Sequence, residues 1–154
     1  MKKIKAFRTQ SSGFTLIELL IVIAVISILI GIALPRFKGI QDEGNIAKAK
    51  GELRTLQTAV ESYYIHNSQA YPAASSDLIA AGTKPKIVTV IPDDPFAAAG
   101  TDYVYTRGGT NNKYYILYSV GPDGTGSAAI SGTDTVTETN NPIYVSNMSI
   151  DTSP

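Results

Sequence analysis

The chain has 154 residues, which is enough for one small domain beside a membrane segment. It contains no cysteine and a single histidine, which excludes disulfides, thiol catalysis, cysteine-ligated zinc and any multi-histidine metal site. Basic and acidic residues number 13 each, but four of the basic ones lie within the first eight residues, so the rest is weakly acidic and nucleic acid is not expected as the main partner.

A short basic leader precedes a long apolar run. Residues 1–13 are basic and polar, whereas residues 14–37 are almost wholly apolar, with no charge from Leu19 to Pro35. A helix of about 24 residues is roughly 36 Å long, enough to cross a bilayer. The basic flank predicts one membrane span with its N-terminus in the cytoplasm.

Glu18 is a charge inside this membrane-length run, which is costly and indicates a function with a partner. An ordinary signal peptide does not fit, because the run is too long and lacks a small-x-small cleavage site. A plain signal anchor explains length and orientation, but neither Glu18 nor the position of Gly13 between charge and apolarity. Cleavage between Gly13 and Phe14 would remove the leader, keep the span and create an amino group on Phe14.

The segment Gly13-Phe14-Thr15-Leu16-Ile17-Glu18 resembles the class III signal of type IV pilins and type II secretion pseudopilins. The resemblance implies that a prepilin peptidase cuts after Gly13 and methylates the Phe14 amine. It also implies that Glu18 pairs with the Phe14 amine of a neighbouring subunit. Because both charges are costly when unpaired at low dielectric, such a pair sets the axial register of assembly. In the free monomer we expect Glu18 to reach the headgroups or to be protonated.

Gly31 and Pro35 are predicted to weaken the helix. Pro35 lacks the N–H that would bond to the Gly31 carbonyl, and glycine is itself a poor helix former. One interpretation is a fixed kink where the helix leaves the membrane. The other is local melting when the helix enters a tight bundle, which the pilin resemblance supports.

Residues 38–70 are predicted to form the amphipathic half of the same long helix. Apolar residues recur there at spacings of three and four: Ile46, Ala49, Leu53, Leu56, Val60 and Tyr63. A helix packed on a sheet is favoured over a coiled coil, because the stripe lasts for only about three heptads. His66, beside several tyrosines, is interpreted as a packing residue.

Residues 71–154 are predicted to form a small C-terminal domain with a β-hairpin and long polar loops. Ser75 or Ser76 is expected to cap a short helix over residues 77–81 that Gly82 ends. Residues 127–141 have little pattern. The strand-like runs are 102–106 and 114–120, which flank a turn at 108–112, and 142–146.

The order of these segments resembles major pseudopilins of type II secretion, in the 92–96 turn, the Tyr-rich hairpin and the Gly-Pro-Asp-Gly loop at 121–124. Phe96 departs from the Trp common in that family, and the tail after Asp134 is longer. The resemblance implies a structural calcium, with Asp123 as a ligand and Asp134 joining it, since calcium takes carboxylate and carbonyl oxygens. The alternative is a simple Pro-Asp-Gly turn.

The sequence contains no catalytic constellation, so we predict a structural protein and not an enzyme. The predicted fold class is α+β and pilin-like, with a long N-terminal helix packed on a small antiparallel sheet. The resemblance implies a type II secretion pseudopilus subunit, held in the inner membrane and assembled by a membrane platform and an ATPase into a homo-oligomeric filament in the periplasm or at the cell surface. The alternatives are a type IV pilus subunit for adhesion, motility or DNA uptake, and a monomeric membrane-anchored binding module.

Overall fold

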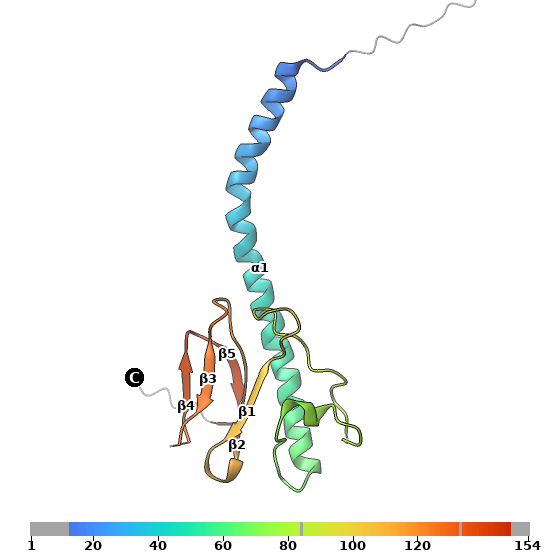
Figure 1. Cartoon of the computed structure of the whole chain (residues 1–154), viewed down its shortest axis with the longest axis vertical. Helices are drawn as coiled ribbons and strands as arrows, with labels where there is room; N and C mark the ends of the chain where they lie inside the picture. The colour runs from blue at the N-terminus through green and yellow to red at the C-terminus, as the bar shows by residue number, and fades with distance from the viewer. Residues whose placement is uncertain (1–12, 84, 133, 149–154) are drawn as a thin grey trace, which may run out of the picture. The chain divides into compact units, whose positions relative to one another are not determined.

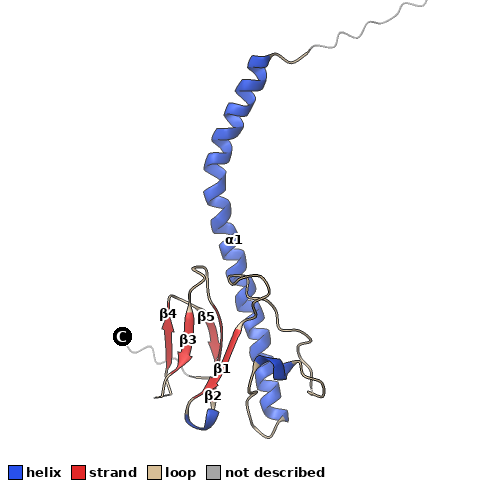
Figure 2. Ribbon diagram, viewed as in Figure 1, coloured by secondary structure: helices blue, strands red, loops and turns tan. Residues whose placement is uncertain are grey.

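The structure, a computed structural model, describes residues 13–83, 85–132 and 134–148. It divides into two compact units, one ending at Ile40 and one beginning at Gln41. Helix α1, Leu16–His66, runs through this boundary without interruption (Figure 2). Residues 1–12 of the predicted leader lie outside the described residues.

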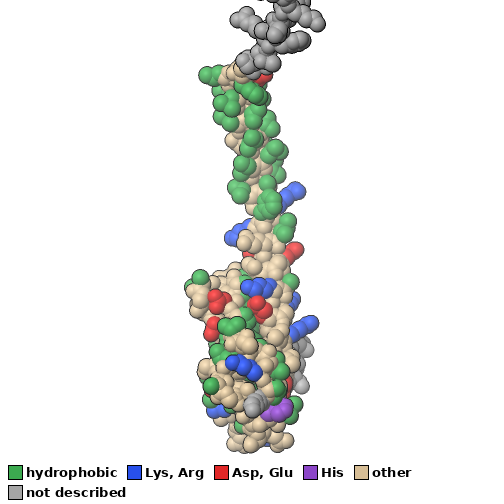
Figure 3. Space-filling model, turned by 90° about the vertical axis from the view of Figure 1, so that its right-hand side faces the viewer, with side chains coloured by type: hydrophobic (Ala, Val, Ile, Leu, Met, Phe, Trp, Pro, Cys, Tyr) green, Lys and Arg blue, Asp and Glu red, His purple; other side chains and the backbone are tan. Residues whose placement is uncertain are grey.

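The first unit is dominated by an apolar helix surface. Every Leu, Ile, Val and Phe side chain from Leu16 to Phe37 is between 48% and 81% exposed. Figure 3 shows hydrophobic side chains covering this part of α1. By length and composition α1 is able to span a membrane. An apolar surface of this extent has to be covered by lipid or by other helices.

Pro35 lies inside α1, and residues 31–35 remain helical. The lost hydrogen bond at Pro35 therefore does not end the helix in the single chain. Local melting on assembly concerns a different state, and it stays a prediction.

The second unit contains two antiparallel sheets (Figure 1). In the first sheet, β2 (Tyr114–Ser119) lies between β1 (Val104–Gly108) and β5 (Ile143–Ser146), and β1 pairs with β2 as a hairpin. This agrees with the predicted hairpin and the predicted last strand. The weakly patterned residues 127–141 form a second hairpin, which the sequence did not predict. Its strands are β3 Ser127–Ile130 and β4 Val136–Thr139.

The core of the second unit lies between the amphipathic half of α1 and the three-stranded sheet. Ala49, Leu53, Leu56 and Val60 of the predicted stripe are buried, which confirms the helix-on-sheet prediction. These side chains belong to one cluster with residues of the loops and strands, namely Leu78, Val88, Ile91, Tyr103, Tyr115 and Leu117.

Two phenol–carboxylate hydrogen bonds connect α1 to the sheet side of this core. The Tyr103 hydroxyl donates to Glu52 Oε2 at 2.6 Å, and the Tyr115 hydroxyl donates to Glu61 Oε1 at 2.7 Å. Burial raises the pKa of both tyrosines, and the adjacent glutamates raise it further. Burial also raises the pKa of Tyr105, whose hydroxyl donates to the Pro72 carbonyl at 2.8 Å.

These raised pKa values predict alkaline unfolding. A phenol whose pKa is raised by folding stabilises the fold fully below the unfolded pKa of about 10, and that contribution falls as pH rises above it. We expect the melting temperature to fall steeply above about pH 10, with Tyr103, Tyr105 and Tyr115 ionising only on unfolding. Absorbance titration of the phenolates beside circular dichroism checks this. Ionisation of all nine tyrosines before any loss of ellipticity would contradict it.

The predicted short helix was wrong in its bounds. The structure has a 3₁₀ turn, η1 Ser75–Leu78, so both serines lie inside it and do not cap it. Asp77 is the reason, because its Oδ2 accepts hydrogen bonds from the N–H groups of Ala73 and Ala74 at 2.8 and 3.1 Å. The Asp77 carboxylate thus binds the backbone N–H groups just before the turn, and Ala74 instead of a serine is the residue at which the turn begins.

Candidate processing and assembly site

The Gly13–Phe14 bond lies in a non-helical segment immediately before α1. Phe14 is 88% exposed. A methyl group built on Gly13 would meet no heavy atom within 4 Å. The predicted cleavage bond is therefore accessible in the single chain, and the helix starts only after it.

Thr15 and Glu18 form a capping box at the start of α1. The Thr15 N–H and hydroxyl both donate to Glu18 Oε2, at 2.9 and 2.6 Å. The Glu18 N–H donates in return to Thr15 Oγ1 at 3.3 Å. This reciprocal arrangement satisfies helix N–H groups that would otherwise lack partners.

The capping box gives Glu18 a partner in its own chain, Thr15, beside the neighbouring amine that the family resemblance implies. The signal was present in the sequence, as threonine followed three residues later by glutamate ahead of an apolar run. Within the described residues, Glu18 Oε1 takes part in no hydrogen bond or ion pair. One carboxylate oxygen thus holds the helix start, and the other is open to a donor from another chain.

The two predicted calcium ligands lie at opposite ends of the β3–β4 hairpin. Asp134 is in the turn that joins the strands, and its carboxylate accepts from the N–H and hydroxyl of Thr110 at 3.0 and 3.1 Å. Asp123 is exposed in the loop before β3. At that end of the hairpin Asn140 Nδ2 donates to the Thr125 carbonyl at 3.5 Å.

This donor set does not fit a calcium shared by the two aspartates. Among the described residues, no three His, Asp or Glu side chains gather where they could hold a metal. Calcium requires six to eight oxygens, and around Asp123 backbone carbonyls and water would have to supply most of them.

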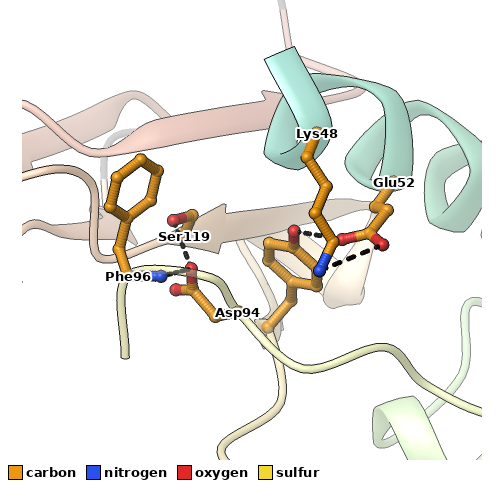
Figure 4. Close-up of polar contacts among 6 residues, drawn as sticks. Lys48, Glu52, Asp94, Phe96 and Ser119 are labelled. Carbon is orange, nitrogen blue, oxygen red and sulfur yellow. Dashed lines mark hydrogen bonds and ion pairs between the residues drawn. The ribbon is translucent and has the colours of Figure 1, made fainter. Parts of the chain in front are cut away.

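A buried carboxylate in the 92–96 turn lies near the loop that contains Asp123, and its role was not predicted from the sequence. Asp94 is 4% exposed, and Oδ1 accepts from the Ser119 hydroxyl at 2.7 Å and the Phe96 N–H at 3.0 Å. Its Oδ2 accepts from the Val120 N–H at 2.9 Å. Figure 4 shows Asp94 pointing toward Ser119 and Phe96. This carboxylate fastens the 92–96 turn to the end of β2.

A capped apolar helix that continues into an amphipathic half packed on an antiparallel sheet is the arrangement of the pilin-like class. Residues 8–34 match the prokaryotic N-terminal methylation motif. Residues 36–137 match the family described as type II secretion system (T2SS), protein G. The chain therefore belongs to the protein G family of type II secretion.

Comparison with individual proteins gives relatives of this family and one shorter match to a pilin. The chain is 32% identical to type II secretion system core protein G of Pseudomonas aeruginosa, over 76% of this chain and 87% of that protein. It is 31% identical to the protein of the same name from Pectobacterium carotovorum, over 75% and 78%. The type IV major pilin protein PilA of Myxococcus xanthus is 42% identical over 40% of this chain and 28% of its own length. No solved structure matches.

Proposed function

We propose that this chain is the repeating structural subunit of a type II secretion pseudopilus. The observation that carries the proposal is the exposed apolar surface of α1 from Leu16 to Phe37, which begins directly after an accessible Gly13–Phe14 bond and carries Glu18 in its first turn. Lipid covers such a surface in the stored monomer, and the helices of other copies cover it in a filament.

Glu18 and Phe14 form the assembly contact in this proposal. Cleavage after Gly13 creates an amine on Phe14, and Glu18 Oε1 of a neighbouring copy accepts it. The two charges meet at only one axial position of neighbouring copies, and there their attraction compensates the cost of removing both from water. The pair therefore fixes the register of assembly more than it adds stability. The capping box keeps Glu18 Oε2 satisfied before a neighbour arrives.

Processing and assembly require partners that the chain meets at the inner membrane. A prepilin peptidase cuts and methylates the chain, a membrane platform adds subunits, and an ATPase supplies the work. The basic charge of the leader favours an N-terminus in the cytoplasm and the second unit in the periplasm. The filament then grows in the periplasm toward the outer envelope.

Processing predicts a defined mature terminus. Purified filaments are expected to begin at Phe14, one methyl group heavier than the encoded residue, by N-terminal sequencing and mass spectrometry. Gly13→Leu is expected to leave the leader uncut, whereas the matched variant Gly31→Leu, in a helix position with open space, is expected to be cut normally. An intact leader in all mature protein contradicts the proposal.

The second candidate is a type IV pilus subunit, favoured by the short match to the Myxococcus pilin. Deletion of the gene separates the two functions. Loss of protein export with normal surface motility and DNA uptake supports the pseudopilus, and the reverse supports the pilus.

The third alternative is a membrane-anchored monomer. In that case we expect cross-linking in cells to give no high-mass species.

We also propose a weak calcium site at Asp123 alone. Since sites with few charged ligands bind in the range of about 10⁻⁴–10⁻³ M, millimolar calcium is expected to raise the melting temperature by a few degrees and a chelator to reverse this. Asp123→Asn should remove the calcium effect, while Asp134→Asn should retain it. A melting temperature that calcium does not change would contradict this site.

A further inference from the structure

A polar cavity of about 700 Å³ opens in the second unit between two turns. One turn follows the C-terminal end of α1, at residues 68–71. The other closes the β1–β2 hairpin, at residues 109–113. The volume of this open cavity lies in the range of small-molecule sites in proteins.

The lining combines positive charge with neutral polar groups. Arg107 and Lys113 line the cavity, and no Asp or Glu that the structure describes is part of its lining. Neither cation has an ion-pair partner within the described residues. Arg107 Nη1 donates to the Tyr71 carbonyl at 2.9 Å, which holds the guanidinium in place and leaves its other N–H groups for a ligand.

Some of the lining groups are occupied by the fold. Asn147 donates to the Tyr71 hydroxyl and the Lys113 carbonyl, at 3.1 and 3.0 Å, and accepts from the Tyr115 N–H at 3.0 Å. Other groups have no hydrogen-bond partner within the described residues: the hydroxyl of Tyr64 and the side-chain amides of Gln69, Asn111 and Asn112. The cavity therefore presents several neutral donors and acceptors beside its two cations.

Aromatic rings form one wall of the cavity. Tyr64 stacks on Tyr71 with ring centroids 4.4 Å apart and an interplanar angle of 25°. The Tyr71 ring contacts Tyr115 in turn, with centroids 4.9 Å apart. This stack fixes the Tyr64 ring as a rigid apolar surface with a polar hydroxyl at its edge.

The backbone of both turns is held in an unfavourable conformation. Ser68, Gln69, Asn111 and Asn112 all have positive φ, between 54° and 61°. Glycine adopts this conformation without strain and asparagine tolerates it, so the backbone cost falls mainly on Ser68 and Gln69. The two turns thus hold four polar side chains at the edge of one cavity.

We propose that this cavity binds a sugar acid, that is, a hydroxylated ring bearing a carboxylate. The carboxylate pairs with Arg107 and Lys113, the hydroxyls bond to the amides of the two turns, and a ring face lies on Tyr64. A neutral sugar would leave both cations unpaired, and a bare anion would leave the amides and the aromatic wall without contacts.

Calorimetry with the full-length chain in detergent micelles tests this proposal. D-Galacturonate or D-glucuronate is expected to bind saturably, and D-galactose and acetate at least about tenfold more weakly. Lys113→Gln should weaken uronate binding by about tenfold, whereas Lys86→Gln, an exposed lysine outside the cavity, should not. No saturable heat with either uronate, equal binding of galactose, or unchanged binding by Lys113→Gln overturns the proposal.

Glycine variants separate binding from folding. Gln69→Gly and Asn111→Gly relieve the strained backbone, so each is expected to keep or raise the melting temperature while weakening uronate binding. If both glycine variants bind the uronate as the unchanged chain does, these side chains only shape the turns and the proposed site is wrong. Neither variant touches Phe14 or Glu18, so this result is independent of filament assembly.

Discussion

Replacing Glu18 by glutamine is expected to reduce filament formation at least about tenfold while the chain still inserts into the membrane. Glutamine is accepted at the third helix position of a capping box, so the hydrogen bonds with Thr15 are retained. The variant removes only the negative charge of Glu18, which we propose pairs with the Phe14 amine of the next copy. It therefore separates the register role of Glu18 from its role in starting the helix.

Two further variants complete the measurement. Thr15→Ala removes the cap, and because a lost cap costs about 1 kcal/mol, we expect a milder assembly defect than with Glu18→Gln. Glu43→Gln changes an exposed helix carboxylate in the second unit and should assemble normally. Filament mass after shearing and membrane-fraction content of each variant are the readouts. Normal filaments from Glu18→Gln would show that charge pairing does not set register.

The parts of this fold that the sequence predicted are those specified by local pattern. The span from Leu16 to Phe37 is recognisable from composition, and the buried stripe from Ala49 to Val60 follows the helical period. The β1–β2 hairpin is indicated by β-branched and aromatic residues around a Gly-Asn turn. In each case neighbours in sequence carry the information.

The β3–β4 hairpin was missed because its residues lack a strand pattern. In β3 only Ala128 is buried, and β4 is exposed at every position except Val136, which is partly exposed. Neither strand shows the large apolar residues alternating with polar ones that indicate a strand of a half-buried sheet. Contacts with β2 and β1, which sequence pattern alone does not indicate, support β3 instead.

The candidate site was predicted in its residues but not in its local geometry. Gly13, Phe14 and Glu18 follow from a motif, whereas the use of one Glu18 oxygen for the cap follows only from the hydrogen bonds. The expectation that Asp134 joins Asp123 at a calcium ion rested on the family resemblance. The β3–β4 hairpin places them at its two ends, because β3 runs from the loop with Asp123 to the turn with Asp134.

Replacing Asp94 by alanine is expected to destabilise the second unit more than any other single carboxylate change there. The substitution leaves three buried or partly buried donors without an acceptor: the Ser119 hydroxyl and the N–H groups of Phe96 and Val120. Each orphaned donor costs about 1–3 kcal/mol, so we expect a loss of roughly 3–5 kcal/mol. For a domain of this size that corresponds to a fall in melting temperature of roughly 15 °C or more.

The neighbouring Asp93 provides the matched control. Asp93 is exposed and accepts one hydrogen bond, from the Gly100 N–H at 3.2 Å, so Asp93→Ala is expected to cost less than about 1 kcal/mol. Asp94→Asn keeps one acceptor but turns an amide toward an N–H donor, so it should fall between the two. Thermal melts of the full-length chain measure all three. A melting temperature of Asp94→Ala within a few degrees of Asp93→Ala would mean that water replaces the carboxylate and that the 92–96 turn is fastened by packing alone.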